Sequence, residues 1–286
     1  MNKASVGIIG GSGLYDIEGI KIIEEVSMDT AWGKPSDSIV IAEADGVRAA
    51  FLPRHGRGHF ILPHEINFRA NIAALKMLGV SEIYAFSAVG SLQERIRPLD
   101  FVMPSQVIDR TKARPGTFFG EGVAAHIAFA HPFCARLQGI VEPLAKKQGL
   151  TMHVDETLIC MEGPAFSTRA ESELYRSWGA GLINMSAIPE AKLAREAEIC
   201  YCMICMCTDY DCWKEDEQHV NVEMLIGHLN SNAQAAKDLV KVLLKETGKK
   251  RTCECGDTVK YAVITAPEKR NPQTVAKLKT ILPKYF

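Results

Sequence analysis

Two closely spaced carboxylates are the first residues of this chain that suggest chemistry. Asp209 and Asp211 lie in the segment TDYDCW, between aromatic residues and directly after an apolar run, Ile199–Cys207. An apolar run without alternation is typical of a strand covered on both faces in an α/β sheet, and the ends of such strands carry ligand groups. With Thr208, the pair could bind a ligand rich in hydrogen-bond donors or form a solvated turn. The local sequence favours neither alternative.

A second set of polar groups is suited to binding an anion. Ser186 precedes Pro189, which fits the first turn of a helix, so Ser186 should lie at a helix N-terminus, where free N–H groups attract anions. A simple capping role is the alternative for Ser186. Arg54 and His55 follow a predicted strand over Val47–Leu52, and a guanidinium group matches the oxygens of phosphate. A zinc site is the alternative for the histidines nearby, although their spacing fits no zinc motif.

Two further strands run into turns of small residues. Val6–Ile9 leads into Gly-Gly-Ser12-Gly, and Glu82–Phe86 leads into Ser87 and Ala88. The first turn resembles a dinucleotide-binding fingerprint only loosely, because the third glycine is missing at the required spacing. We therefore expect a turn that offers a hydroxyl group and backbone N–H groups to a lone phosphate, with an ordinary tight turn as the alternative.

The nine cysteines are numerous for a chain of 286 residues. Cys200, Cys202, Cys205 and Cys207 cannot all bind one metal ion, because side chains alternate between the faces of a strand. Most cysteines are expected to pack as small apolar groups. Cys253 and Cys255 form a C-x-C in a polar segment, which suggests a disulfide to each other or to the cysteine-rich strand.

The charge and composition of the chain argue against two classes of protein, those that bind nucleic acid and those that span a membrane. A net charge of −1 gives no basic field for nucleic acid, and no apolar run reaches the ~18 residues that a membrane helix needs. A cytoplasmic protein is expected. Short strands alternate with helices to the end of the chain, so residues 1–286 are predicted to form a single α/β domain. The predicted later elements include helices over Phe68–Leu78, Phe133–Gly149 and Val222 to about Thr247, and a last strand near Tyr261–Thr265.

Two segments are harder to assign from pattern alone. Phe118–Cys134 combines glycines, aromatic residues and the histidines at 126 and 131, and it is too apolar for a free loop, so we expect it to pack against another subunit. Phe166 lies in a strand-to-helix turn before a predicted capping box at Thr168 and Glu171. Its ring could belong to the core or form a stacking surface.

Six motifs in order resemble the trimeric purine nucleoside phosphorylase superfamily, and within it the 5′-methylthioadenosine phosphorylases. The motifs are GIIGGSGLYD, PRHGRGH, SAVGS, MEGPAFSTRAES, NMSAIPEAKLAREA and TDYDCW, and they span nearly the whole chain. The resemblance implies a central mixed β-sheet flanked by helices. It also implies phosphorolysis of methylthioadenosine to adenine and methylthioribose-1-phosphate, with inorganic phosphate as co-substrate and no metal or organic cofactor.

The resemblance also implies a role for each matching residue. Phosphate would be bound by Ser12, Arg54, His55, Ser87, Ala88 and Ser186. The base and ribose would be bound by Phe166, Met185, Thr208, Asp209 and Asp211, and the methylthio group by Val222, Leu225 and Ile226. His126 would reach that pocket across a subunit boundary of a homo-oligomer, expected to be a trimer, with a hexamer as the alternative.

Charge decides the chemistry that these groups could do. The sugar becomes cationic as adenine leaves, so a bound phosphate dianion stabilises the transition state, with Ser186 among its ligands. Asp209 could donate to the ring nitrogen of the base, and Asp211 could accept from the exocyclic amine. The rivals are a 6-oxopurine or methylthioinosine phosphorylase, a nucleosidase that uses water, and a non-catalytic nucleoside-binding protein.

Overall fold

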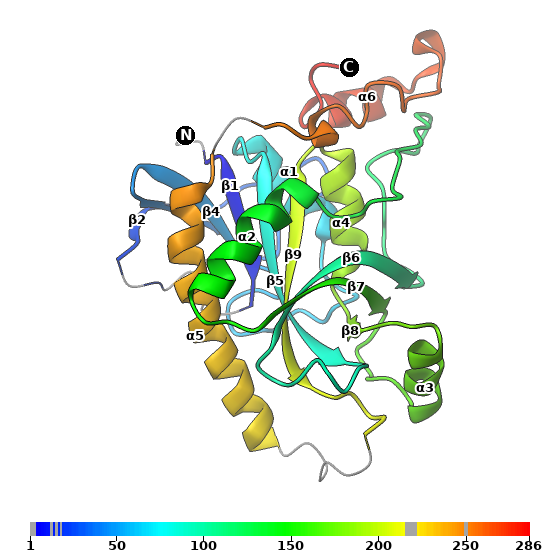
Figure 1. Ribbon diagram of the computed structural model, residues 1–286. Coiled ribbons are helices and arrows are strands. Elements are labelled where there is room, and N and C mark those ends of the chain that lie inside the picture. The colour runs from blue at the N-terminus through cyan, green and yellow to red at the C-terminus, as the bar shows by residue number, and fades with distance from the viewer. Residues whose placement is uncertain (1–3, 12–13, 15–16, 18, 215–221, 249–250) are drawn as a thin grey trace.

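The computed structural model of the protein is built around one mixed β-sheet of nine strands (Figure 1). It describes residues 4–11, 14, 17, 19–214, 222–248 and 251–286, with the backbone alone for 222–226. The strands are β1 (Val6–Gly10), β2 (Lys21–Val26), β3 (Ile39–Ala44), β4 (Val47–Pro53), β5 (Glu82–Ser91), β6 (Phe101–Arg110), β7 (Met152–Met161), β8 (Leu182–Asn184) and β9 (Cys200–Asp209). The predicted mixed sheet is confirmed.

The strand order places the middle of the sheet under the candidate site. The order is β2-β3-β4-β1-β5-β8-β7-β6-β9, and β9 also pairs with β5, so the strands from β5 to β9 close on themselves. β1 runs parallel to β4 and β5, and β5 runs parallel to β9. The carboxyl ends of these four strands therefore meet at one edge of the sheet.

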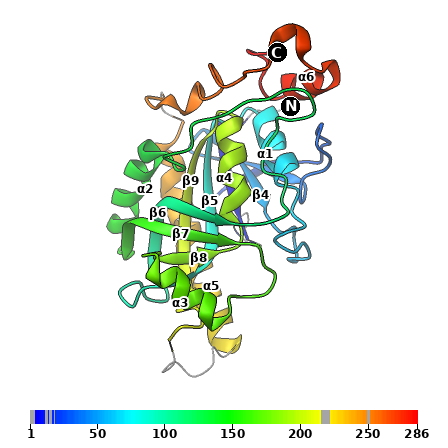
Figure 2. The same cartoon turned by 90° about the vertical axis from the view of Figure 1, so that its right-hand side faces the viewer.

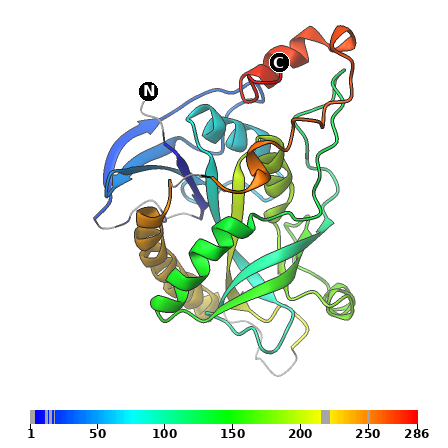
Figure 3. The same cartoon turned by 45° about the horizontal axis from the view of Figure 1, so that its top comes forward.

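Helices cover both faces of the sheet (Figures 2 and 3). The helices are α1 (Phe68–Met77), α2 (Ala135–Lys147), α3 (Arg169–Ser177), α4 (Ala187–Glu196), α5 (Val222–Glu246) and α6 (Pro272–Lys279). One apolar core contains residues of α1 and α4, and a second contains residues of α2 and α5. Among the described residues, no helix is both long and apolar enough to cross a membrane.

β9 separates these two cores, because its side chains alternate between them. Cys205 and Cys207 face the core with α1 and α4, whereas Cys200 and Cys202 face the core with α2 and α5. The prediction that these cysteines cannot form one cluster is therefore confirmed. All nine cysteines are free, so the predicted disulfide of Cys253 or Cys255 is absent.

Three helix ends that were predicted from the sequence are confirmed by the structure. Gly79 ends the first helix in a left-handed conformation at φ 97°, which glycine adopts without strain. Thr168 and Glu171 form the predicted capping box at the start of α3. Pro189 begins the regular part of α4, because Ile188 before it has extended backbone angles.

The predicted strand near Tyr261–Thr265 is wrong. That segment forms turns, and its only strand-like contact among the described residues is a single bridge between Ala125 and Val263. The bridge pairs it with the predicted apolar segment 118–134, which has no regular secondary structure before residue 135. Apolar residues of two irregular segments pack together here without joining the sheet.

Candidate active site

The site is assembled where the parallel strands end. Gly10 at the end of β1 pairs with Pro53 of β4, and the backbone N–H of Arg54 donates to the Gly10 carbonyl at 2.8 Å. Along β5, Ser87 lies opposite Cys205 and Gly90 lies opposite Asp209 of β9. Gly90 also pairs with Ile183 of β8, which brings the chain after β8 to the same place. The pairing of the strands therefore brings together five of the six sequence motifs.

Arg54 forms the centre of the anion-binding side. Its guanidinium group donates to both carboxylate oxygens of Glu190, at 2.8 and 2.9 Å, and to the carbonyl oxygen of Phe86 at 2.8 Å. Arg54 is only 2% exposed and Glu190 is fully buried. Burial alone would lower the pKa of Arg54, but the charge of Glu190 and the hydrogen bonds to it together raise that pKa. Arg54 is therefore a fixed, permanently charged group.

Two buried hydroxyl groups belong to the segments that contact this guanidinium: Ser87 follows Phe86 on β5, and Ser186 precedes α4, which carries Glu190. The Oγ atoms of Ser87 and Ser186 are 3.1 Å apart, and the side-chain amide of Asn184 donates to Ser87 Oγ at 3.3 Å. Ser186 is the N-cap residue of α4, yet its hydroxyl makes no capping hydrogen bond. The simple capping role is thus excluded, and the hydroxyl remains available at the start of a helix, where an anion is favoured.

His55 adds a neutral imidazole. Its Nδ1 lies 2.8 Å from the carbonyl oxygen of Ile61, so Nδ1 carries the proton that it donates, and Nε2 keeps a lone pair. Burial lowers the pKa of His55 to about 4. The ring stacks on His59 with centroids 4.2 Å apart. Among the described residues, these histidines belong to no group of metal-ligating side chains, so the zinc alternative has no support.

The carboxylate pair lies at the other end of the site. The carboxylate of Asp209 accepts a hydrogen bond from the hydroxyl of Thr208 at 2.7 Å and one from the backbone N–H of Asp211 at 2.8 Å. Asp209 is only partly exposed, so the alternative of a fully solvated turn does not hold. Burial, and then the charge of Asp209, raise the pKa of Asp211. Asp211 therefore retains its proton to a higher pH than an isolated carboxyl group does.

Gly90 leaves the space that the carboxylates occupy. A Cβ atom at this position would lie 3.1 Å from Asp209 Oδ1 and 3.1 Å from Ile183 Cγ2. Ser87 and Gly90 are three residues apart on β5, and thus separated by about 10 Å. That separation leaves room for a sugar between the hydroxyl groups at one end and the carboxylates at the other.

Phe166 belongs to the segment that follows β7, and Met185 belongs to the turn that follows β8. Met185 packs against Gly163, where a Cβ atom would lie 2.5 Å from its sulfur atom. Arg114 donates to the Met185 carbonyl at 2.6 Å and to the Ile188 carbonyl at 2.8 Å, which fixes the turn that contains Ser186. Phe166 is 80% exposed, so it does not belong to the core and remains free to form a stacking surface.

Of the remaining predicted residues, only Ala88 lies at this place among the residues that the structure describes. His126 is exposed, and its backbone N–H donates to the carbonyl of Ala262 in the C-terminal segment. Ala88 is exposed on β5 next to Ser87. Ser12 lies outside the described residues, as do the side chains of Val222, Leu225 and Ile226.

Three residues of the site have no motif that predicts their role. Glu190 binds Arg54 from a position 136 residues away in the sequence, and nothing local indicates that partner. Asn184 belongs to the predicted polar turn, but its contact with Ser87 comes only from the β5–β8 pairing. His228 of α5 lies with Nδ1 2.8 Å from the carbonyl oxygen of Thr208, where it supports the strand end.

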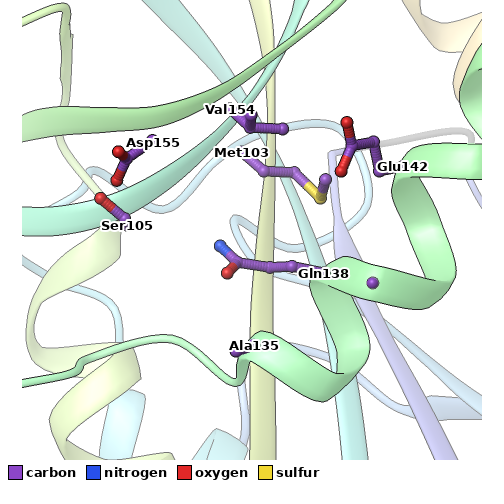
Figure 4. A pocket seen from close by; sticks show the side chains of 8 residues that line it. Met103, Ser105, Ala135, Gln138, Glu142, Val154 and Asp155 are labelled. Atoms are coloured by element: carbon purple, nitrogen blue, oxygen red, sulfur yellow. The ribbon is translucent and has the colours of Figure 1, made fainter.

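A separate surface hollow is not this site. It has a volume of about 270 Å³ and lies between α2 and the strands β6 and β7, with Gln138 and Glu142 on one side and Met103 and Val154 on the other (Figure 4). None of the predicted site residues lines it. The candidate site is defined instead by the side chains that converge at the strand ends.

Known proteins share this sequence and fold. The sequence model of the Phosphorylase superfamily matches residues 5–245. S-methyl-5′-thioadenosine phosphorylase of Synechocystis is 51% identical over 290 aligned positions, which cover 100% of this chain and 89% of that protein. The protein with the same name from Schizosaccharomyces pombe is 49% identical, with 99% and 98% of the two chains covered.

Solved structures agree with this relationship. The structure of a methylthioadenosine phosphorylase from an Antarctic soil metagenomic library has a TM-score of 0.93 at 43% identity, covering 99% of this chain and 100% of that one. The enzyme from Schistosoma mansoni in complex with adenine has a TM-score of 0.84 at 34% identity, covering 94% and 99%. The resemblance seen in the six motifs is thus confirmed, and the chain belongs to the phosphorylase superfamily.

Proposed function

We propose that this protein catalyses the phosphorolysis of S-methyl-5′-thioadenosine to adenine and 5-methylthioribose-1-phosphate. The observation that carries the proposal is the arrangement along β5: a buried guanidinium and two hydroxyl groups at one position, and a carboxylate pair three residues further along. The names of the relatives support the same reaction. The adenine bound to the Schistosoma mansoni enzyme supports a site for that base.

The anion-binding groups would bind inorganic phosphate. A guanidinium has five N–H donors, and three of those of Arg54 are used by Glu190 and Phe86, so two remain for phosphate. Ser87 and Ser186 would add hydroxyl groups, and the predicted Ser12 and Ala88 backbone contacts would complete the set. His55, with a lone pair on Nε2, would accept a hydrogen bond from the hydroxyl group that hydrogen phosphate still carries.

The carboxylate pair would bind the adenine. Asp211 would accept from the exocyclic amine, and Asp209 would donate to the ring nitrogen that gains electrons as the glycosidic bond breaks. Asp209 would donate either through a proton of its own or through a bridging water molecule. The bound phosphate on the opposite side of the sugar would stabilise the cationic transition state.

The same carboxylates argue against the rival reactions. A 6-oxopurine offers an acceptor where adenine offers a donor, and a site with mismatched buried polar groups can discriminate by as much as ~10⁴–10⁵. A nucleosidase or a non-catalytic nucleoside-binding protein would not need the buried Arg54 and its neighbouring hydroxyl groups. Methylthioadenosine should therefore be cleaved in preference to inosine.

Incubation with methylthioadenosine, adenosine and inosine, with and without phosphate, tests this function. Chromatography of the released base should show adenine from methylthioadenosine, less from adenosine, and no hypoxanthine. Asp209→Asn should lose cleavage of adenine nucleosides first. Full activity of that variant on methylthioadenosine would contradict the acid role of the pair, and hypoxanthine as the main product would support the 6-oxopurine alternative.

We further propose that residues 1–286 form one domain and that the protein acts in the cytoplasm as a homo-oligomer. We also propose that it uses no catalytic cofactor and binds neither nucleic acid nor a membrane. A trimer is the proposed state, with a hexamer as the alternative. His126 is exposed beside a segment where Tyr261 is 86% and Ile264 is 65% exposed, which supports a subunit contact there. Light scattering of the purified protein, and of a Tyr261→Glu variant, would test the assembly.

A further inference from the structure

Four cysteine side chains from three distant parts of the chain meet at the amino end of β9. Cys134 is the N-cap residue of α2, Cys200 is the first residue of β9, and Cys253 and Cys255 belong to the turn around residues 254–256. Their four sulfur atoms all lie within 4.8 Å of one another. Cys200 and Cys253 are 3.3 Å apart, and Cys134 and Cys253 are 3.7 Å apart.

These separations suit the corners of a metal site. Four thiolates around zinc, each with a Zn–S distance of about 2.3 Å, lie at tetrahedral corners separated by about 3.8 Å. A disulfide would instead bring two sulfur atoms to about 2.05 Å. We propose that Cys134, Cys200, Cys253 and Cys255 bind one Zn²⁺ as a closed tetrathiolate site.

The surroundings favour the charge of such a site. Zinc binding would take the proton from each of the four thiols, so one Zn²⁺ and four thiolates would carry two net negative charges. Arg136 lies with Nη2 3.6 Å from Cys200 Sγ and 2.6 Å from the carboxylate of Glu82. Its Nε atom is buried and has no hydrogen-bond partner among the described residues. A cation and the N-terminus of α2 thus face the sulfur atoms.

The position of the site indicates a structural role. Cys200 and Asp209 are at opposite ends of β9, about 30 Å apart along an extended strand, so zinc here would take no part in phosphorolysis. With all four ligands supplied by the protein, no position is open to a substrate. The site would fasten the segment after α5 to the sheet, next to the hydrogen bond from Arg251 to the carbonyl of Glu198.

This site was not expected from the sequence, which predicted no metal. Cys200 lies on the opposite face of β9 from Cys205 and Cys207, as strand alternation predicts, but its partners come from the start of α2 and from the C-terminal turn, which no pattern within the strand indicates. A disulfide to the cysteine-rich strand was one of the two alternatives for Cys253 and Cys255, and Cys253 does lie 3.3 Å from Cys200 of that strand, although no disulfide joins them. Zinc ligation accounts for their odd C-x-C in a polar segment without a disulfide.

Metal analysis of the whole protein tests the proposal. The chain is purified without oxygen, reductant or chelator, and its zinc content is measured by mass spectrometry. We expect about one zinc per chain, and an X-ray absorption spectrum with four sulfur neighbours at about 2.3 Å. Protein stripped of metal should take up one equivalent of zinc, and its melting temperature should rise when it does.

A double variant and a matched control complete the test. Cys253→Ser with Cys255→Ser should lose the zinc and melt at the lower temperature of the stripped protein, whereas Cys212→Ser, which alters an exposed cysteine outside the cluster, should keep its zinc. Protein that holds no zinc and takes none up would overturn the proposal. So would a count of free thiols in denaturant four below the nine of the sequence, because that result means two disulfides.

Discussion

Replacing Arg54 by methionine should separate the stability of the buried ion pair from its function. The substitution leaves the carboxylate of Glu190 fully buried without its partner. Breaking a buried ion pair from one side costs about 3–5 kcal/mol of unfolding free energy. Arg54→Met should therefore lose that amount in urea unfolding followed by circular dichroism, and it should also lose activity.

The double variant Arg54→Met with Glu190→Gln should recover most of the stability. The glutamine oxygen can still accept the hydrogen bond that Tyr201 donates to Glu190 at 2.7 Å, and no buried charge remains. The lost bond to the Phe86 carbonyl accounts for a residual cost of about 0.5–1.5 kcal/mol. A double variant no more stable than Arg54→Met would refute the argument from the buried charge.

Activity should not recover in the double variant. Two N–H groups of Arg54 remain for phosphate, and hydrogen bonds to charged groups contribute about 1.5–3 kcal/mol each, so kcat/KM for phosphate should fall by roughly 10²–10⁴-fold. The control is Arg136→Met, which breaks a second ion pair, to Glu82, at the opposite end of β5. That variant should lose stability and keep its phosphate kinetics. Near-normal kcat/KM in the double variant would exclude Arg54 as a phosphate ligand.

Three further substitutions test other parts of the site and fold. Gly90→Ala places a Cβ atom 3.1 Å from Asp209 Oδ1 and should displace that carboxylate. Steady-state kinetics should then show a roughly 10–100-fold lower kcat/KM for the nucleoside. Unchanged kinetics would show that the carboxylate does not depend on the space at Gly90. The pKa of His55 lies near 4, below its unfolded value, so its contribution to stability is complete above about pH 6.5 and is lost as the pH falls towards 4. Urea unfolding should therefore show that the wild type loses about 1–2 kcal/mol more unfolding free energy than His55→Gln does between neutral pH and about pH 5. Equal losses in the two proteins would contradict this role of His55. Thr168→Ala removes the hydroxyl group that caps α3 and should lower the unfolding free energy by about 1 kcal/mol in the same assay. Thr168→Ser keeps a hydroxyl group and should lower it less. Equal losses in the two variants would mean that the effect does not come from the cap.

Local chemistry made much of the site predictable from the sequence. Arg54, Ser186 and Asp209 follow or end strands, and the rule that ligand groups lie at strand ends was enough to select them. Ser87 was selected by the same rule, but the predicted turn after Phe86 is wrong, because β5 continues to Ser91. Their convergence depends on β5 pairing with both β8 and β9, which no local pattern contains. Glu190 could not be predicted for the same reason, because its role comes from a contact between distant segments.

Two of the strands that were not predicted from the sequence, β2 and β6, have physical reasons for being hidden. β2 is largely exposed and lies at the edge of the sheet, so its apolar pattern is weak. β6 contains Pro104, which argues against a strand, and its pairing with β7 shifts register at that residue. A strand was wrongly predicted at Tyr261–Thr265. Apolar residues there do pack against residues 124–125, but they form a single β-bridge and not the repeated pairing of a strand.

Phosphorus NMR of the reaction with methylthioadenosine is the most direct test of the central claim that phosphate is the attacking group. As adenine is released, the signal of inorganic phosphate should decrease and that of a sugar 1-phosphate should increase in equal amount. Without phosphate, no adenine should appear. Release of adenine with an unchanged phosphate signal would mean that water attacks, and the proposed role of Arg54, Ser87 and Ser186 would be wrong.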